Sequence, residues 1–338
     1  MRSLLLLAVC AVSLLLLVRA KGQVAPMPKD VFRSFDRVLL LEDKGETSAG
    51  VNVGDLNGDG LPDIVLGKGR HWPLYNRVLL NDGRGGFSAS NLGTAPDRTY
   101  SAALADLDRD GSLDIVVSND SPDRKLVYLN DGKGHFTEAG AFGSPTWNTR
   151  YVTLVDLNGD GYPDIVAANR GDGPQSPVPS FICLNDRKGH FPACDPLPTE
   201  SATSIVAGDF DGDGRLDLAI IDERKRAAFV IFHRGQRRFG DLEQLPGRPR
   251  PPYALAVAGL NRDGRPDIVV GNVEMQGSVY FNTGQGRTFH EVPWNDGKGT
   301  VYGLAFADFD GDGWPDIVTA RSDAPNAIWF STKSKSGR

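Results

Sequence analysis

The 338-residue sequence predicts an all-β fold, a six-bladed β-propeller of four-stranded antiparallel blades, with seven blades as the less favoured alternative. The main observation is a nine-residue loop rich in Asp, Asn and Gly that occurs six times, with successive starts 49 to 53 residues apart. A fixed period of this length is typical of solenoids and propellers. Each copy is also followed at once by an apolar run. The copies are residues 55–63, 106–114, 156–164, 209–217, 259–267 and 308–316.

Each repeat contains four candidate strands in the same order, as the second repeat illustrates. Small and apolar residues at 102–105 precede the loop, and a second apolar run at 115–117 follows it. A third run at 126–129 leads into an Asn-Asp-Gly hairpin turn, after which a fourth strand is expected. Four antiparallel strands per fifty residues is the pattern of a propeller blade. The fourth strands are predicted to start at Phe87, Phe136, Phe191, Phe239 and Phe289.

The two ends of the repeat region predict how the ring closes. The sixth repeat stops after its third strand, whereas residues 31–41 form a strand-like segment ahead of the first loop. We expect this segment to complete the sixth blade, which would remove an open sheet edge that invites aggregation. The predicted propeller therefore covers residues 31–332 and is followed by a polar tail at 333–338.

The first twenty residues have the pattern of a secretory signal peptide. Arg2 precedes an apolar run over residues 4–18, and residues 18–20 resemble a cleavage site. The run is too short to span a membrane comfortably, so a retained anchor is the less favoured alternative. We expect a signal peptide at 1–20 and a linker at 21–30. The mature protein is expected to be secreted or periplasmic, monomeric and without a membrane span.

The nine-residue loops have the composition of calcium sites. Positions 1, 3, 5 and 9 carry Asp or Asn in nearly every copy, and position 6 is always Gly. Ca²⁺ takes six to eight oxygen ligands, and a tight loop can aim the side chains of alternate residues at one point, with the carbonyl of position 7 added. Glycine permits the positive φ that such a loop needs. The alternative is that Asp and Gly only form turns. The expected ligands are Asp55, Asn57, Asp59 and Asp63; Asp106, Asp108, Asp110 and Asp114; Asp156, Asn158, Asp160 and Asp164; Asp209, Asp211, Asp213 and Asp217; Asn261, Asp263 and Asp267; and Asp308, Asp310, Asp312 and Asp316.

The fifth copy differs from the others at its first position. It has Gly259 where the other five have Asp, so only Asp263 and Asp267 carry charge in that loop. Fewer anionic ligands weaken calcium binding. The sequence therefore predicts about five strong calcium sites and one weak one.

Two cysteines are expected to form a disulfide. Cys10 lies in the signal peptide, which leaves Cys183 and Cys194 as a pair in an oxidising compartment. They flank a predicted turn at 185–189 and can face each other across one hairpin. A bond of this kind contributes roughly 2–3 kcal/mol. A metal or catalytic thiol is the alternative, but no second Cys pair lies nearby to support it.

Composition argues against several classes of function. The formal net charge is −6, and much of the acidic excess lies in the loops, where bound calcium would neutralise it. No basic stripe with interleaved aromatic residues points to nucleic acid. The serine-hydrolase and zinc-protease motifs are absent from the sequence, and it contains only five His.

The Asp-x-Asn/Asp-Gly-Asp-Gly-x-x-Asp loops, the Asp-Ile-Val strands and Phe87 with Gly85 and Gly86 before it resemble the FG-GAP/VCBS repeat family, which includes integrin α-subunit propellers. The resemblance covers about residues 31–332. It implies a calcium-stabilised β-propeller. Family members include adhesion receptors, secreted lectins and polysaccharide-acting enzymes, so the resemblance leaves the function open. Gly259 is the one departure from the motif.

A second set of residues is expected on the face opposite the nine-residue loops, where connections vary between repeats. Tyr100, Tyr253 and Tyr302 each fall six residues before a loop and should surround the mouth of the central channel. Aromatic rings beside polar groups suit sugar or peptide ligands. The alternative is that these rings only pack neighbouring blades together. The predicted ligand-binding residues are His71, Trp72, Tyr100, Trp147, Arg150, Tyr151, Tyr253 and Tyr302, with Tyr75 and Arg98 on the same face.

We interpret the chain as an exported, calcium-stabilised binding or adhesion module for a carbohydrate or an extracellular protein. The alternative is a calcium-dependent polysaccharide lyase or hydrolase that uses His71 or Arg150. The tripeptide at 170–172 matches an integrin-recognition sequence, and we interpret it as a chance match. Asn119 begins a glycosylation sequon, which matters only if the source glycosylates exported proteins.

Overall fold

The computed structural model describes residues 47–331, apart from residues 85, 172–175, 236–237, 248–249, 285–286, 308–312, 323–326 and 330. This part of the chain is built of β-strands and contains no helix. The strands form six separate sheets, and every hydrogen-bonded pair of neighbours is antiparallel. The sheets follow the chain in order, as the six repeats predict.

The first three sheets each have four strands. The first contains β1 (Ser48–Gly54), β2 (Asp63–Lys68), β3 (Arg77–Asn81) and β4 (Phe87–Asn91). The second contains β5 (Thr99–Ala105), β6 (Asp114–Asn119), β7 (Lys125–Asn130) and β8 (Phe136–Phe142). The third contains β9 (Asn148–Val155), β10 (Asp164–Arg170), β11 (Phe181–Cys183) and β12 (Cys194–Pro196).

The fourth and fifth sheets also have four strands, and the described part of the sixth has three. The fourth contains β13 (Ala202–Gly208), β14 (Asp217–Asp222), β15 (Ala227–Ile231) and β16 (Glu243–Gln244). The fifth contains β17 (Pro252–Ala258), β18 (Asp267–Asn272), β19 (Gly277–Asn282) and β20 (Phe289–Trp294). The sixth contains β21 (Thr300–Ala307), β22 (Asp316–Ser322) and β23 (Ala327–Trp329).

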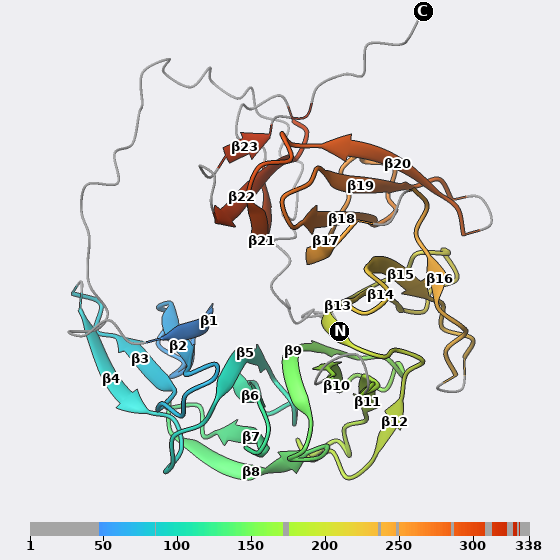
Figure 1. Cartoon of the computed structure of the whole chain (residues 1–338). Coiled ribbons are helices and arrows are strands. Elements are labelled where there is room, and N and C mark those ends of the chain that lie inside the picture. Colours follow the sequence, from blue (N-terminus) through green and yellow to red (C-terminus); the bar gives the residue numbers. More distant parts are fainter. Residues whose placement is uncertain are drawn as a thin grey trace, which may run out of the picture.

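The six sheets are arranged as blades around a common centre, with the first strand of each sheet innermost (Figure 1). These inner strands pack in sequence, β1 on β5, then β9, β13, β17 and β21. The all-β propeller architecture is thereby confirmed. Residues 31–41, the predicted closing strand, lie outside the described residues, so ring closure stays a prediction. The predicted signal peptide, linker and polar tail lie outside them as well.

The core lies between the blades, and the second strand of each blade shows why its sequence is continuously apolar. Every residue of β6 is buried. Val116 packs toward the third sheet, whereas Ile115 and Val117 pack toward the first, because side chains alternate along a strand. A strand buried on both faces needs no polar alternation. One apolar cluster of this kind lies between each successive pair of sheets.

Two of the predicted fourth strands start later than expected. Strands β4, β8 and β20 begin at the predicted Phe residues, but β12 begins at Cys194 and β16 at Glu243. Pro192 follows Phe191 directly and cannot donate a ladder hydrogen bond there. Phe239 makes only an isolated bridge to His233, against whose ring it stacks. The predictions for Phe191 and Phe239 were therefore wrong.

The chain direction divides the connections between two ends of the molecule. The six nine-residue loops and the turns between third and fourth strands form one end, which we call the loop face. The turns between second and third strands and the connections from blade to blade form the other, which we call the entry face.

Polar contacts between neighbouring blades run along the loop face. In four sheets an Asn is the last residue of the third strand or lies two residues after it, and its amide can cross to the blade before it. Asn130 Nδ2 donates to the carbonyl of Leu56, Asn185 Nδ2 to Leu107, and Asn282 Nδ2 to Phe210, at 2.7 to 2.8 Å. Each acceptor is at position 2 of the preceding blade's loop, so the same bond is repeated from one blade to the next.

The fourth sheet breaks this series because His233 takes the place of Asn. His233 is buried, and neither ring nitrogen has a hydrogen-bond partner in the described structure. Its ring stacks on Phe239 with the ring centroids 4.7 Å apart. A cavity of about 20 Å³ lies beside it, lined also by Leu157, the residue whose carbonyl would be the acceptor. The third and fourth blades therefore lack the bond that joins the first to the second, the second to the third and the fourth to the fifth blade.

We expect His233→Asn to stabilise the protein, because an Asn amide can donate a hydrogen bond to the Leu157 carbonyl. The unpaired ring nitrogens of His233 are removed at the same time, and a buried polar group without a partner costs about 1–3 kcal/mol. Thermal unfolding should show a melting temperature higher by about 2–4 °C. The reciprocal change, Asn185→His, is the matched control and should lower it. A lower melting temperature for His233→Asn would show that the stacking on Phe239 outweighs the missing bond.

Candidate functional site

Each of the first four nine-residue loops is folded around the carboxylate at its first position. In the first loop, Asp55 Oδ1 accepts a hydrogen bond from the amide of Gly58 at 2.8 Å, and Oδ2 accepts one from Gly60 at 2.9 Å. Both glycines have positive φ, 74° and 81°, which an L-side chain rarely adopts. The invariant Gly at position 6 is thereby explained by backbone geometry.

The carboxylate at position 9 joins the loop to the third strand of the same sheet. Asp63 is fully buried, and its Oδ2 accepts from the amide of Leu56 while Oδ1 accepts from the amide of Asn81. The same pair of bonds, at 2.7 to 3.0 Å, recurs at Asp114, Asp164, Asp217 and Asp267. From the sequence, position 9 was predicted only as a metal ligand, and this structural role was missed. Its presence even in the divergent fifth copy was the available signal.

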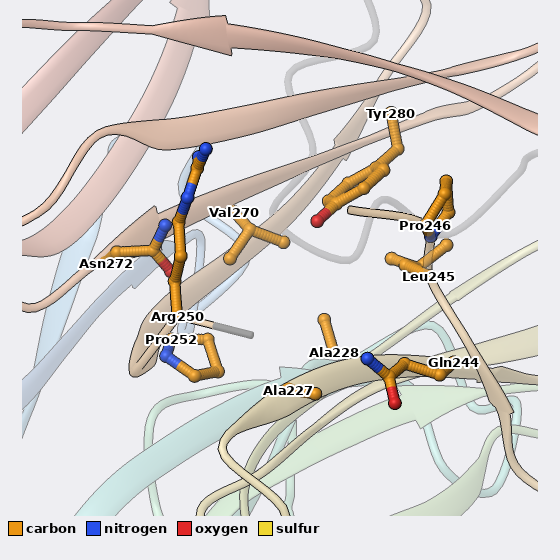
Figure 2. Close-up of a pocket in the computed structure, with 10 residues that line it drawn as sticks. All are labelled: Ala227, Ala228, Gln244, Leu245, Pro246, Arg250, Pro252, Val270, Asn272 and Tyr280. Atoms are coloured by element: carbon orange, nitrogen blue, oxygen red, sulfur yellow. The ribbon is translucent and has the colours of Figure 1, made fainter. Parts of the chain in front are cut away.

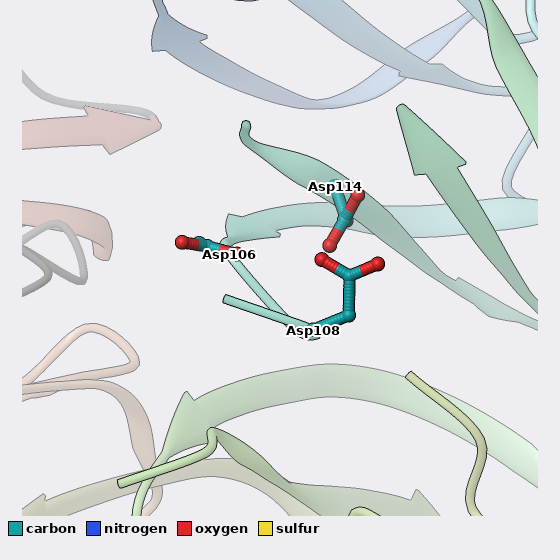
Figure 3. A group of neighbouring side chains, drawn as sticks. All are labelled: Asp106, Asp108 and Asp114. Carbon is teal, nitrogen blue, oxygen red and sulfur yellow. The ribbon is translucent and has the colours of Figure 1, made fainter. Parts of the chain in front are cut away.

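The donor set of two loops fits a hard divalent cation. Carboxylate oxygens of Asp106, Asp108 and Asp114 lie within 4.8 Å of one another, as do those of Asp209, Asp211 and Asp217. Figure 3 shows the carboxylates of Asp108 and Asp114 facing each other. Asp106 Oδ1 is buried and has no hydrogen-bond partner in the described structure, which leaves it available to an ion. Such all-oxygen groups are those that Ca²⁺ prefers.

The first and third loops differ from this arrangement at their third position, and the fifth loop differs at its first. In the first loop Asn57 Nδ2 donates to Asp59 Oδ2 at 2.9 Å, so an amide replaces one carboxylate. The third loop likewise has Asn158, whose Oδ1 accepts from the amide of Asp160. These loops offer three carboxylates where the second and fourth offer four.

The fifth loop forms its turn without a carboxylate at position 1. Asp267 keeps both of its backbone bonds, to Leu260 and Asn282. The guanidinium of Arg265 pairs with Asp263 and donates to the carbonyl of Asn282. The fourth loop has the equivalent pair, Arg215 with Asp213, so the missing carboxylate at position 1 is what separates the fifth loop from it, and the weak site stays a prediction. In the sixth loop Asp308, Asp310 and Asp312 lie outside the described residues, and only the backbone of Asp316, at the start of β22, is described.

Burial perturbs the position-9 carboxyl groups strongly in the absence of an ion. Desolvation raises the pKa of Asp114 to about 7 and that of Asp164, Asp217 and Asp267 to about 6. The backbone amides that donate to each group lower its pKa, but they do so by less than burial raises it. A bound cation would reverse this balance, because it favours the ionised form.

On the entry face, the structure brings together three of the predicted residues from three successive blades. The hydroxyl of Tyr100 lies 3.1 Å from His71 Nε2, and the Arg150 guanidinium carbon lies 3.9 Å from the centre of the Tyr100 ring. Asp120 connects them: Arg150 Nη1 donates to its Oδ2 at 3.0 Å, and His71 Nδ1 is 3.7 Å from the same atom. We call His71, Tyr100, Asp120 and Arg150 the His71 cluster.

The His71 cluster combines exposed polar groups with a buried carboxylate, that of Asp120. Asp120 is buried, and its Oδ1 lacks a hydrogen-bond partner in the described structure, as does Arg150 Nε. Burial raises the pKa of the Tyr100 hydroxyl, so this group is a proton donor at neutral pH. Asp120 was not among the predicted residues. Its position directly after a fully buried second strand is the signal that could have found it.

The remaining predicted residues of this face have different surroundings. Trp147 stacks on Phe181 with the ring centroids 4.0 Å apart and belongs to the core between the second and third blades, so the packing alternative is right for this residue. Arg98 is held by both carboxylate oxygens of Asp123. Of Tyr302 only the backbone, in β21, is described. The predicted rings that are exposed are Trp72, Tyr75, Tyr151 and Tyr253.

The two short motifs have structural roles. The guanidinium of Arg170 is held by Glu223 through two hydrogen bonds, at 2.8 and 3.2 Å, and Asp172 lies outside the described residues. Asn119 is fully buried, donates its side-chain amide to the carbonyl of Arg124 and accepts from Thr99. An acceptor asparagine must be at the surface. Asn119 is therefore a structural residue in this fold.

The cavities between blades are small. One, shown in Figure 2, has a volume of about 20 Å³ and lies between the fourth and fifth blades, with Arg250, Asn272 and Tyr280 in its wall. The Arg250 guanidinium donates to the carbonyl of Gln276 and to the Ser278 hydroxyl. Together with the cavity beside His233, this space suits a single water molecule rather than a ligand.

Cys183 and Cys194 form the predicted disulfide, at paired positions of β11 and β12. The bond joins the short third and fourth strands of the third sheet. Within the described residues, no helix has the length and apolar character needed to cross a membrane.

Comparison with known proteins places this geometry among repeat proteins. A family model for the FG-GAP-like repeat matches residues 55–117, 110–167, 156–220 and 259–319, together about two thirds of the chain. Cartilage acidic protein 1 of Mus musculus is 27% identical over 282 residues, which are 74% of this chain and 42% of that protein. Integrin alpha-7 of Homo sapiens is 28% identical over 174 residues, 45% of this chain and 15% of that protein. The chain thus spans less than half the length of these relatives.

A solved structure has a similar fold. A chain in the crystal structure of BBS1N in complex with ARL6DN aligns with a TM-score of 0.53 at 13% identity, covering 85% of this chain and 80% of that one. At this identity the likeness concerns the fold alone.

Metal-free protein should become more stable as the pH falls from about 7.5 to about 5. Burial raises the pKa of Asp114 to about 7 and that of Asp164, Asp217 and Asp267 to about 6, above the ordinary value of 3.8, so the folded state binds more protons in this range. Stability from these groups is therefore present at low pH and lost as the pH rises through 6 to 7.

The measurement is the melting temperature of dialysed, metal-free protein across this pH range, repeated with millimolar calcium. With calcium the trend should be opposite, because protons then compete with the ion. Asp114→Asn, which cannot ionise, should flatten the metal-free trend. A metal-free melting temperature that falls toward pH 5 would show that these carboxylates stay ionised in the fold.

Proposed function

The chain belongs to the FG-GAP-like repeat family, and from this premise we propose that it is an exported binding module of the adhesion type. In this proposal calcium stabilises the propeller on the loop face, and the entry face binds a carbohydrate or a protein ligand. The disulfide between Cys183 and Cys194 supports export, because such bonds persist in oxidising compartments.

The observation that carries the proposal is the separation of two chemistries at opposite ends of the same strands. Strand β5 begins at the entry face beside Tyr100 and ends at the loop that starts with Asp106. The loops hold carboxylates bonded to their own backbone, whereas the His71 cluster offers donors and acceptors near exposed aromatic rings. A scaffold that is stabilised at one end leaves the other end available for binding.

In the loops, calcium would be held by the carboxylates of positions 1, 3, 5 and 9. When bound, it would supply positive charge that offsets the repulsion between clustered carboxylates. Asp114 and Asp217 hold the loop and the third strand together through backbone amides, so an ion at these residues would stabilise the connection between two strands. This role is structural and requires no contact between calcium and the ligand.

Several features favour binding over catalysis. A general base needs a pKa near the working pH, yet burial raises that of Tyr100 above its ordinary value of 10.0. His71 is exposed, with 56% of its side chain accessible, and it lies on an open surface rather than in a closed pocket. An enclosed, water-excluding site is typical of enzymes. The alternative, a polysaccharide-acting enzyme, relies on the contact between His71 and Tyr100.

We expect the exported protein to bind a ligand from a glycan array or an extracellular protein array in the presence of calcium. Arg150→Ala and His71→Ala should weaken that binding at least tenfold, because both side chains contact Tyr100 or Asp120. Arg170→Ala removes an arginine of the same face that is paired with Glu223, and this matched control should bind normally. Circular dichroism would confirm that all variants fold.

Binding that is unchanged in both cluster variants would contradict the location of the site. Turnover of a bound polysaccharide that is abolished by His71→Ala would replace the binding module with the enzyme. Removal of calcium should lower the melting temperature and the binding together, since the proposal makes the ion a part of the scaffold.

A further inference from the structure

We infer that the ligand of the entry face is an anionic glycan, with its carboxylate or sulfate at Arg70 and a sugar ring against Trp72. This inference rests on the proposed function and names the class of ligand. Arg70 was not among the predicted ligand-binding residues. The argument starts from the turn that presents both side chains.

Residues 69–72 form a tight turn that is docked against the start of β5. The amide of Trp72 donates to the carbonyl of Gly69 at 2.9 Å, and the amide of Arg70 donates to the carbonyl of Thr99 at 3.1 Å. Gly69 has φ of 104°, and a Cβ there would lie 2.1 Å from the Trp72 carbonyl oxygen, so only glycine fits. The turn therefore holds Arg70, His71 and Trp72 in a fixed order beside Tyr100.

Arg70 is the cation of this region that has no carboxylate within ion-pair distance in the described part of the chain. The other two arginines nearby are paired, Arg150 with Asp120 and Arg98 with Asp123. Arg70 is exposed, and its guanidinium carbon lies 5.6 Å from the centre of the Tyr100 ring. Its fork of donors is available to an external carboxylate or sulfate, which guanidinium groups bind through two parallel hydrogen bonds.

Trp72 supplies an apolar surface next to this charge. Its side chain is 68% exposed, the highest fraction among the large apolar residues of the described structure. Trp72 is two positions from Arg70 in the same turn, so the Cα atoms of the two residues lie within about 7 Å of each other. A uronic acid or a sulfated sugar has both features that these side chains can bind, an apolar C–H face of the ring and an acidic group beside it.

An acidic peptide could also pair with Arg70, but the surroundings favour a sugar. Tyr100 and His71 offer a hydroxyl and an imidazole that can donate to or accept from sugar hydroxyls. Peptide binding is one outcome of the test.

The test compares a uronic-acid polymer, the same polymer with its carboxyl groups reduced, and a sulfated glycan, each measured by calorimetry with calcium present. We expect the carboxylated or the sulfated form to bind at least tenfold more tightly than the neutral form. The ratio between the first and third polymers identifies which anion is preferred. Added salt should weaken the binding, because the ion pair between Arg70 and the anionic group of the glycan is exposed to solvent.

Arg70→Asn is the test variant, because Asn tolerates the φ of 51° at this position. It should abolish the preference for the anionic form, whereas Trp72→Ala should weaken both forms and Arg170→Ala neither. Equal affinity for charged and neutral polymers, with binding still lost in Arg150→Ala, would overturn this inference and leave the proposed function. An acidic peptide that binds as tightly as the glycan would overturn the ligand class.

A second inference comes from the loop face, where we propose that Arg287 competes with calcium in the fourth loop. The hairpins of the second and third sheets have glycine two residues before the Phe of the fourth strand, Gly134 and Gly189, with φ of 78° and 73°. The fifth sheet has Arg287 at that place, with φ of 65°. A bulky residue in this left-handed region is uncommon and indicates a role for its side chain.

The side chain of Arg287 reaches the loop of the preceding blade. Its Nε and Nη2 donate to Asp211 Oδ2 at 3.1 and 2.8 Å, and its guanidinium carbon lies 4.2 Å from the centre of the Phe232 ring. Asp211 is at position 3 of the fourth loop and is one of the three carboxylates grouped there. The second loop has the same donor set, but Gly189 is the residue of the next blade at the corresponding place.

The fourth loop therefore has two arginines on its carboxylates, Arg287 on Asp211 and Arg215 on Asp213, whereas the second loop has none among the described ion pairs. The fourth loop is expected to bind calcium more weakly than the second, and Arg287 is the cation that a neighbouring blade contributes. Terbium luminescence and native mass spectrometry count the sites and give their affinities without any ligand assay. Arg287→Gly should raise the affinity of the fourth loop about fivefold or more, because a positive charge beside a cation site is removed. In an Asp209→Asn background the same change should have no effect.

Lys133→Gly is the matched control, because it removes one positive charge from the hairpin of the second sheet, where Lys133 is exposed. It should leave all affinities unchanged. A calcium affinity of the fourth loop that falls or stays constant in Arg287→Gly would overturn the proposal. It would show that Arg287 only links the fifth blade to the fourth.

Discussion

The fold depends on a buried carboxylate that accepts two backbone hydrogen bonds, once in each of the first five blades. Asp63 and its counterparts close the turn between the first and second strands and also bond the amide that follows the third strand. A buried amide without a partner is costly, and a buried charge even more so, so each needs the other. This one residue thereby holds three strands of a blade in register at the loop face. The fifth loop shows that the arrangement persists without a carboxylate at position 1.

The same carboxylates connect folding with ion binding. Burial makes their charge unfavourable, and neighbouring carboxylates in the loop add to the repulsion. A divalent ion and an arginine side chain are two ways to offset this cost, and the chain uses arginine in at least two loops, Arg265 on Asp263 and Arg287 on Asp211. The loops are therefore a graded series rather than six equal sites. Such variation is expected where each blade packs only against its neighbours.

The entry face follows different rules because its loops do not carry the backbone cap. Its turns vary in length, but several are held by a side chain at the same place of the second strand: Asn119, Asn169 and Asn272 each donate to a carbonyl ahead of the third strand. The turns can still present residues such as His71 and Trp72 to solvent, and the blades bring side chains from successive repeats together. The family to which the chain belongs accounts for the scaffold.

The sequence by itself determined the repeat period, the nine-residue loops, the second strands and the disulfide, because these depend on local pattern and spacing. It could not show that Trp147 belongs to the core or that His233 lacks a polar bond to the blade before it, because each depends on a neighbouring blade. The late starts of β12 and β16 have local causes, since Pro192 follows Phe191 and Phe239 stacks on His233 of the same sheet. The meeting of His71, Tyr100, Asp120 and Arg150 follows from the tertiary structure alone. These residues belong to three successive repeats, and contact between them arises from the packing of adjacent sheets, which no single repeat encodes.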